Sequence, residues 1–347
     1  MTSIHSQEGR TVRRLVPIAA ATVTAILLTA ACATSEAAQN ERSQGATPTL
    51  AGAAVVSSPP ASPVAAEPAI AAPARTGLPT TFLAVRDDSR LVMADTATGR
   101  DQRVLFDLGP QDDTGEQQAI NGLALSPDRR TAFFSVGPEP MHGVLYKVAV
   151  DGGPAERIGS GWRPAVSPDG RRLASMELDT VVVRDLATGA VRRLEPEEDN
   201  ISDPMAVAWA ADSRHLFVDA IWQQSLRVVD ADTATNWADG PLLGPGPDHG
   251  EYWLTGVRAT DGSVGALIAL YPPQSDAAEP ARTFVVLDPA TGAETSRLDL
   301  PFAAWSSVYD ATGRHQLFVA EDGSLHRHSW GGGFTTIPGA GATRVAW

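Results

Sequence analysis

Residues 164–174 read Pro-Ala-Val-Ser-Pro-Asp-Gly-Arg-Arg-Leu-Ala, which is an apolar strand, a tight turn and the start of a second apolar strand. Proline sets φ in such a turn, and glycine supplies the positive φ that closes it. Related copies occupy 123–134 and 207–217, and weaker ones occupy 257–262 and 308–315. Counted at the position of the aspartate, the copies fall at 128, 169, 212, 261 and 312, with spacings of 41, 43, 49 and 51 residues. The chain therefore repeats one structural unit.

A second motif alternates with the first and consists of an apolar strand followed by Asp-x-x-Thr-Gly. Its copies lie at 91–99, 181–189 and 284–292, with a variant at 228–233. In such a turn the aspartate accepts hydrogen bonds from its own backbone, and glycine takes the left-handed conformation. We therefore interpret the repeated aspartates as structural: Asp95, Asp128, Asp169, Asp185, Asp212 and Asp288.

Four short strands in each period of 41–51 residues predict an all-β fold, a six-bladed β-propeller. The expected blades cover about 77–117, 118–161, 162–200, 201–250, 251–301 and 302–340. The first blade lacks an innermost strand, and residues 342–347 match the strand at 207–209. We therefore expect the C-terminal strand to complete the first blade and close the ring.

The Ser-Pro-Asp-Gly-Arg-Arg-Leu-Ala unit resembles the TolB-like, WD40-like (PD40-type) propeller repeat, and the resemblance covers residues 77–347. The repeat is specific for the fold and only weakly specific for function. TolB itself is a periplasmic scaffold that works through protein partners. The resemblance thus implies a binding or scaffold role.

Residues 1–31 predict an export signal. Arg10, Arg13 and Arg14 precede 17 uncharged, mostly apolar residues, and small residues lead to Cys32. This end resembles the bacterial lipobox, with Thr29 where leucine is usual. The resemblance implies cleavage before Cys32, a covalent lipid on its thiol and attachment to the outer face of the cytoplasmic membrane. An uncleaved anchor, short of the roughly 20 residues of a span, and a soluble secreted form remain alternatives.

Residues 32–76 predict a lipidated cysteine followed by a disordered tether, because residues 33–76 are rich in Ala, Pro, Ser and Thr and contain no aromatic residue. The formal charge is −14, and removal of residues 1–31 would make it more negative. Such a protein is repelled by nucleic acid, so we expect no nucleic-acid partner and a membrane attachment through the lipid alone. Cys32 is the only cysteine, which excludes an internal disulfide.

The sequence contains no Gly-x-Ser-x-Gly, phosphate-binding loop or His-Glu-x-x-His. It therefore favours binding over catalysis, and we expect no cofactor besides the lipid. His326 and His328 are weak metal-site candidates, with an ordinary surface strand as the alternative. Two acidic segments, 195–199 and 112–116, are either solvated loops or cation sites.

Aromatic residues give the best clue to a site. Aligned innermost strands place Trp162 and Trp305 seven residues before the turn position, where the other copies have Asn121, Met205, Leu254 beside Trp253, and Thr343. Trp222 falls in a loop expected to open on the same face. These residues predict a ligand-binding mouth at the channel, although the rings could instead pack between blades. The candidate residues are Asn121, Trp162, Met205, Trp222, Trp253 and Trp305.

The sequence thus predicts a lipid-anchored propeller that acts as a binding or scaffold protein at the cell envelope, with a protein or cell-wall ligand. Two alternatives remain open. One is an envelope propeller enzyme, such as a lyase, a quinone-type enzyme or a sugar-active enzyme. The other is an accessory or sensory subunit of a membrane system.

Overall fold

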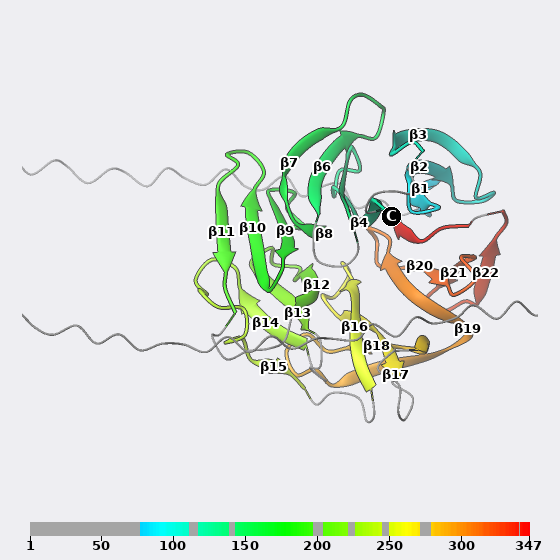
Figure 1. The fold of residues 1–347 in the computed structure, drawn as a ribbon. Coiled ribbons are helices and arrows are strands. Elements are labelled where there is room, and N and C mark those ends of the chain that lie inside the picture. The colour runs from blue at the N-terminus through cyan, green and yellow to red at the C-terminus, as the bar shows by residue number, and fades with distance from the viewer. Residues whose placement is uncertain are drawn as a thin grey trace, which may run out of the picture. The chain divides into compact units, whose positions relative to one another are not determined.

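A computed structural model describes residues 77–110, 117–138, 143–196, 204–220, 226–244, 250–270, 279–339 and 341–347. These residues belong to one compact unit, Ala66–Trp347. The expected signal segment, Cys32 and the whole of the expected tether lie outside the described residues. Every regular element among the described residues is a β-strand, as the all-β prediction requires (Figure 1). Within these ranges no helix is long and apolar enough to span a membrane.

Four sheets have four antiparallel strands each. The first sheet joins the two ends of the unit in the order β23 (Arg344–Ala346), β1 (Thr81–Arg86), β2 (Arg90–Asp95), β3 (Asp101–Asp107). The second sheet contains β4 (Ala119–Leu125), β5 (Thr131–Gly137), β6 (Val144–Ala149) and β7 (Glu156–Ser160). The third contains β8 (Trp162–Val166), β9 (Arg172–Glu177), β10 (Thr180–Asp185) and β11 (Val191–Leu194). The fourth contains β12 (Pro204–Trp209), β13 (His215–Ala220), β14 (Leu226–Asp230) and β15 (Leu242–Leu243).

The remaining strands form one seven-stranded sheet. Its members are β16 (Gly250–Val257), β17 (Val264–Leu270), β18 (Glu279–Leu287), β19 (Glu294–Tyr309), β20 (His315–Ala320), β21 (Leu325–Ser329) and β22 (Phe334–Ile337). Strand β19 is 16 residues long and pairs with β18 mainly through its first half and with β20 through its second half. It therefore crosses the boundary expected between residues 301 and 302, because no turn separates the outer strand of one repeat from the inner strand of the next.

The inner strands contact one another in a closed order. Strand β4 contacts β8, β8 contacts β12, β12 contacts β16, β16 contacts β19, β19 contacts β23, and β23 contacts β4. In Figure 1 the sheets lie around a common centre, and the C-terminus lies beside β1 and β4. The pairing of β23 with β1, through Leu83 with Ala346 and Val85 with Arg344, confirms the prediction that the C-terminal strand completes the first sheet.

The side chain of Arg86 holds this junction together. Its Nε and Nη2 donate to Asp101 Oδ1 at 3.0 and 2.8 Å, Nη2 also donates to the carbonyl of Gly99, and Nη1 donates to the carbonyl of Gly341. Arg86 is only 6% exposed. A buried guanidinium is stable only when its donors are satisfied, so these bonds fix the C-terminal segment against β1 and the start of β3.

The repeated turns have the predicted chemistry. Asp95 Oδ1 accepts hydrogen bonds from the backbone N–H groups of Ala97 and Thr98 and from the Thr98 hydroxyl, and Asp185 and Asp288 do the same in their turns. In the Ser-Pro-Asp turns, Asp128 and Asp169 each accept from the preceding serine hydroxyl and from a backbone N–H. These aspartates are structural.

The described part of the chain has six apolar clusters, of which five lie between neighbouring sheets and one lies between the two halves of the seven-stranded sheet. Most contain large rings, such as Trp162, Trp209 and Trp237 between the third and fourth sheets. The cluster between the second and third sheets is the smallest and has only three fully buried members, Phe133, Leu145 and Leu173. Packing between the sheets is therefore uneven.

Candidate functional site

Five of the inner strands share an irregularity several residues before the turn that ends them. A register shift follows Ile120 in β4, Trp162 in β8, Pro204 in β12, Leu254 in β16 and Ala304 in β19. Each shift inserts extra backbone into the strand and redirects a side chain. The bulges are occupied by Asn121, Arg163 with Pro164, Met205, Thr255 and Trp305.

Two of the candidate residues are buried. Trp162 is 2% exposed and packs in the cluster between the third and fourth sheets, with the Arg163 guanidinium 4.8 Å from its ring centroid. Asn121 is 1% exposed, and its Oδ1 accepts a hydrogen bond from the Ser135 hydroxyl. Both side chains lie inside the protein, so the expectation that they line an accessible mouth needs correction. The bulge in β8 explains why Trp162 is buried, because the bulge places Arg163 at the position where the alignment expects the tryptophan.

Trp253 and Trp305 come together. Their rings are stacked, with centroids 5.8 Å apart and planes at 17°. Trp305 is 45% exposed. Trp253 is half-buried and packs against the apolar cluster of the seven-stranded sheet that contains Phe284 and Phe318. Met205 is half-buried, and its carbonyl accepts from Arg163 Nη1 at 2.6 Å. Trp222 lies outside the described residues.

Buried charge lies beside this pair. Asp219 in β13 is 5% exposed, and its Oδ2 accepts a hydrogen bond of 3.1 Å from the backbone N–H of Leu254, next to Trp253. Burial raises the pKa of Asp219 to about 7, against the opposing effects of the Leu254 N–H and of Arg163. Glu251 in β16 is also buried, and its negative charge raises the Asp219 pKa further.

Sequence reasoning did not single out Asp219 or Glu251. A carboxylate inside the apolar strand 216–220 is the signal that could have found Asp219, since a buried acid requires a partner or neutralisation. Carboxyl groups with strongly shifted pKa values concentrate at functional sites, but they also occur in structural networks. The Trp253–Trp305 pair together with Asp219 is the candidate functional site, hereafter the tryptophan site.

The metal-site candidates His326 and His328 pack against neighbouring aromatic side chains. His326 stacks on Phe302 with centroids 3.8 Å apart, and its ring nitrogens contact Ser324 Oγ at 2.9 Å and Thr336 Oγ1 at 3.2 Å. His328 is 5% exposed and packs against Trp330 and Phe334. Burial lowers the pKa of both imidazoles. Over the described ranges, no three His, Cys, Asp or Glu side chains are grouped so that they could hold a metal ion.

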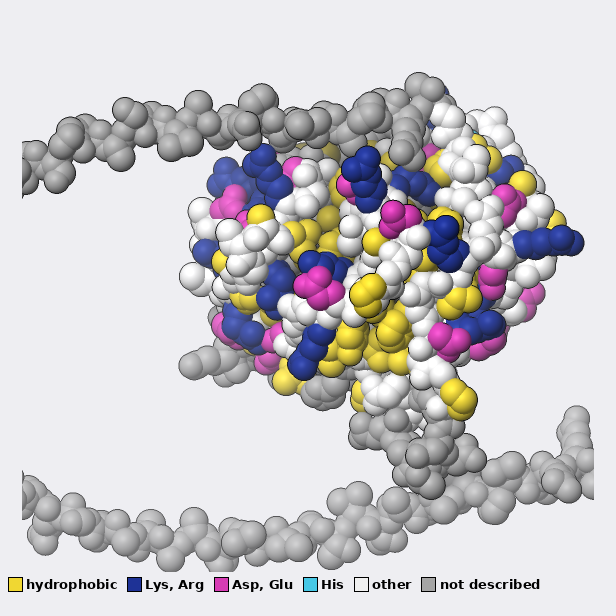
Figure 2. All heavy atoms as spheres, turned by 90° about the horizontal axis from the view of Figure 1, so that it is seen from above, with side chains coloured by type: hydrophobic (Ala, Val, Ile, Leu, Met, Phe, Trp, Pro, Cys, Tyr) yellow, Lys and Arg dark blue, Asp and Glu magenta, His cyan; other side chains and the backbone are white. Residues whose placement is uncertain are grey.

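The acidic segments are only partly described. Glu195 accepts a hydrogen bond from the Thr180 hydroxyl at 2.9 Å and lies 3.5 Å from Arg193 Nε. Glu197, Glu198, Asp199, Asp112, Asp113 and Glu116 lie outside the described residues. On the face drawn in Figure 2, basic and acidic side chains are interspersed with apolar ones, so that face carries no patch of a single sign.

Comparison with known proteins identifies the fold. No protein-family model and no curated protein matches the sequence. Among solved structures, TolB from Acinetobacter baumannii superposes with a TM-score of 0.53 and 17% identity, over 77% of this chain and 65% of that chain. A chain of the nidogen/laminin complex superposes with a TM-score of 0.53 and 13% identity, over 77% of this chain and 97% of that chain. This chain thus spans just under two thirds of the TolB chain. Its described residues form a β-propeller of the kind found in TolB.

Proposed function

We propose that this protein is an extracytoplasmic binding or scaffold protein, held on the outer face of the cytoplasmic membrane by a lipid on Cys32. In this proposal the propeller has six blades and presents the tryptophan site to a protein or cell-wall ligand. The observation that carries the proposal is the exposed Trp305 stacked on Trp253 at a strand bulge.

The blade count is supported by the closed order of inner strands. Four separate sheets account for four blades. The seven-stranded sheet supplies two more if β19 is divided at its bulge, so that its first half is an outer strand and its second half an inner strand. Six apolar clusters then lie between six neighbouring pairs of blades.

The exposed indole supports a binding role. Trp is among the residue types that contribute most to protein interfaces, where it is desolvated in a central position. The stack with Trp253 and the bulge hold the Trp305 ring in one orientation before a partner arrives. A side chain that is already ordered loses less conformational entropy on binding.

The membrane attachment is supported by the sequence before residue 77. The basic residues, the apolar segment and the small residues before Cys32 form an export signal with a lipid-accepting cysteine. The Ala- and Pro-rich segment that follows has the composition of a flexible tether, which would carry the propeller away from the lipid surface.

The binding proposal is tested with the full-length protein in two assays, chemical cross-linking to envelope proteins and co-sedimentation with insoluble cell wall of the source organism. Trp305→Ala should abolish the interaction that the parent shows in one of them. Leu242→Ala is the matched control, because Leu242 is 56% exposed and lies on a different sheet. Equal retention by parent, Trp305→Ala and Leu242→Ala would refute the tryptophan site as a binding surface.

A further inference from the structure

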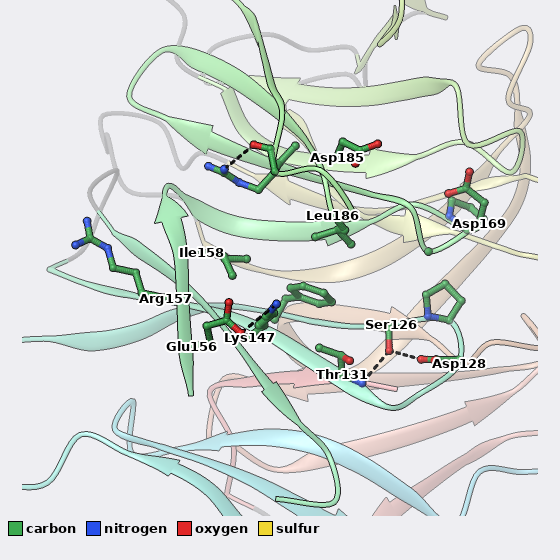
Figure 3. Close-up of a pocket in the computed structure, with 16 residues that line it drawn as sticks. Ser126, Asp128, Thr131, Lys147, Glu156, Arg157, Ile158, Asp169, Asp185 and Leu186 are labelled. Carbon is green, nitrogen blue, oxygen red and sulfur yellow. Dashed lines mark hydrogen bonds and ion pairs between the residues drawn. The ribbon is translucent and has the colours of Figure 1, made fainter. Parts of the chain in front are cut away.

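A cleft lies between the second and third sheets, at the strand ends opposite to the bulges (Figure 3). Its volume is about 610 Å³, which is in the range of small-ligand sites. The Ser-Pro-Asp turns of both sheets, parts of β5, β6 and β7, and the end of β10 with the turn that follows it line the cleft. The tryptophan site shares none of its lining residues.

The inner strands differ in the size of the side chain at one position close to their turns. Three residues before the repeat positions 212 and 312, β12 has Trp209 and β19 has Tyr309, and both rings are buried. At the same position β4 has Leu125, and Arg258 directly follows β16. Trp209 Nε1 donates to the carbonyl of Ala165 at 3.0 Å. The equivalent residue of β8 is Val166, which reaches only the edge of the small apolar cluster around Phe133.

The floor of the cleft is apolar, and one arginine beside it has a hydrogen-bond donor without a partner in the described structure. Phe133, Ile158 and Leu186 line it and belong to or border the same apolar cluster. Arg184 Nε is buried and has no hydrogen-bond partner in the described structure, and Arg184 Nη1 reaches the carbonyl of Gly189 only at 3.5 Å. The Arg184 guanidinium thus retains donor capacity for an acceptor in the cleft.

Most charges of opposite sign lie toward opposite ends of the cleft, and Glu156 and Asp185 also line it. In Figure 3, Asp128 and Asp169 lie at one end, and Arg157, Lys147 and Glu156 lie toward the other. Lys147 is paired with Glu156 at 3.1 Å, so Arg157 and Arg184 supply the positive charge that no described ion pair compensates.

At the acidic end, the turn bonds of Asp128 and Asp169 are accepted by Oδ1, which leaves Oδ2 of each carboxylate for a ligand. The Ser126 hydroxyl lowers the pKa of Asp128, which keeps that carboxylate ionised at neutral pH.

We infer that this cleft binds a short peptide segment that carries a basic group at one end, a carboxylate at the other and apolar side chains between them. The basic group pairs with Asp128 and Asp169, the carboxylate accepts from Arg184 and Arg157, and the apolar side chains cover Phe133, Ile158 and Leu186. The volume, the apolar floor and the separated charges match this chemistry together.

Lys147 provides a direct measurement, because it is the only lysine in the sequence and its side chain is 38% exposed. The full-length protein is treated with an amine-reactive ester, and modification of Lys147 is followed by mass spectrometry. The probe is the blocked peptide acetyl-Arg-Leu-Leu-Glu-amide. Matched controls are the peptides with Glu at both ends, with Arg at both ends and with Gln at both ends.

The mixed-charge peptide should slow Lys147 modification in proportion to occupancy, and the three control peptides should protect weakly. Protection by none of the four, or equal protection by all, would overturn the inference. Arg184→Gln should raise the peptide concentration that gives half protection about tenfold, because it removes one charge-assisted hydrogen bond to the peptide.

Val166→Trp should fill the cleft and remove protection, while Val166→Leu should retain it. Melting temperatures of both variants show whether they are folded. If Val166→Trp does not fold, the Arg184→Gln variant tests whether the peptide occupies the cleft. Trp305→Ala should leave protection unchanged, so failure of the tryptophan site and failure of this cleft are distinguishable. Full protection in a folded Val166→Trp variant would place the peptide elsewhere.

Discussion

The carboxylate of Asp219 in β13 accepts a hydrogen bond from the backbone N–H of Leu254 in β16, 3.1 Å away across the junction of two sheets. This bond ties the strand that carries Trp253 to its neighbour. Because Asp219 is nearly fully buried, the bond also makes the junction sensitive to the protonation of one carboxyl group.

The first prediction is that Asp219 makes folding stability fall as pH rises. Its pKa is about 7 in the folded protein and near 3.8 when unfolded, so the folded state binds more protons between these values. The free energy of unfolding should therefore decrease from about pH 4 to pH 7, by on the order of 4 kcal/mol from this group, and stay low above pH 7.

Asp219→Asn keeps an oxygen that can accept from Leu254 but does not ionise. Denaturant unfolding at pH 5 and pH 8 should show a smaller loss of stability for the variant than for the parent. An identical pH profile for parent and variant would show that Asp219 does not titrate as described.

The second prediction concerns the C-terminal strand. Deletion of residues 342–347 removes the inner strand of the first sheet and the buried side chains of Val345 and Trp347, so the melting temperature should fall sharply. Trp347→Ala alone should cost about 3–5 kcal/mol, the usual effect of truncating a buried aromatic ring. A deletion variant that melts like the parent would contradict the pairing of β23 with β1.

The third prediction separates two tryptophans that the sequence treats as equivalent. Trp162→Ala should cost about 3–5 kcal/mol of stability because it opens a cavity between sheets. Trp305→Ala should cost less than about 1 kcal/mol because its ring is 45% exposed. Chemical denaturation of the two variants under the same conditions measures the difference, and equal costs would count against the burial assigned to each ring.

The fourth prediction concerns the lipid. Cys32→Ser removes the thiol that would carry the acyl chains, each CH₂ of which contributes about 0.8 kcal/mol of membrane binding. The variant should leave the membrane fraction or remain unprocessed, as fractionation and intact mass would show. A Ser variant that is processed and membrane-bound like the parent would exclude the lipoprotein assignment.

The repeats predicted most of the strands, because turn chemistry is local. Ser-Pro-Asp and Asp-x-x-Thr-Gly fix the ends of their strands through bonds within a few residues, such as those of Asp95 and Asp128. The half-repeat at 342–347 predicted the pairing of β23 for the same reason. The continuity of β19 was not predictable in this way, since it depends on the absence of a turn where the repeat spacing placed a boundary, between residues 301 and 302.

The site was harder to predict because counting residues assumes regular strands. Bulges shift the register by one or two residues, so Arg163 and Thr255 take positions that the alignment gives to Trp162 and Leu254. The stacking of Trp253 on Trp305 depends on the packing of distant parts of the chain, and local patterns do not encode it. The burial of Asp219 follows from the same packing.

The first sheet is built from both ends of the propeller, and this has a consequence for biosynthesis. Residues 81–107 leave the ribosome long before residues 344–346 are synthesised, so one edge of β1 stays unpaired while all the other sheets are made. Strand β23 therefore completes the first sheet late in synthesis. A nascent chain that stalls before residue 344 leaves the edge of β1 unpaired and open to aggregation and proteolysis.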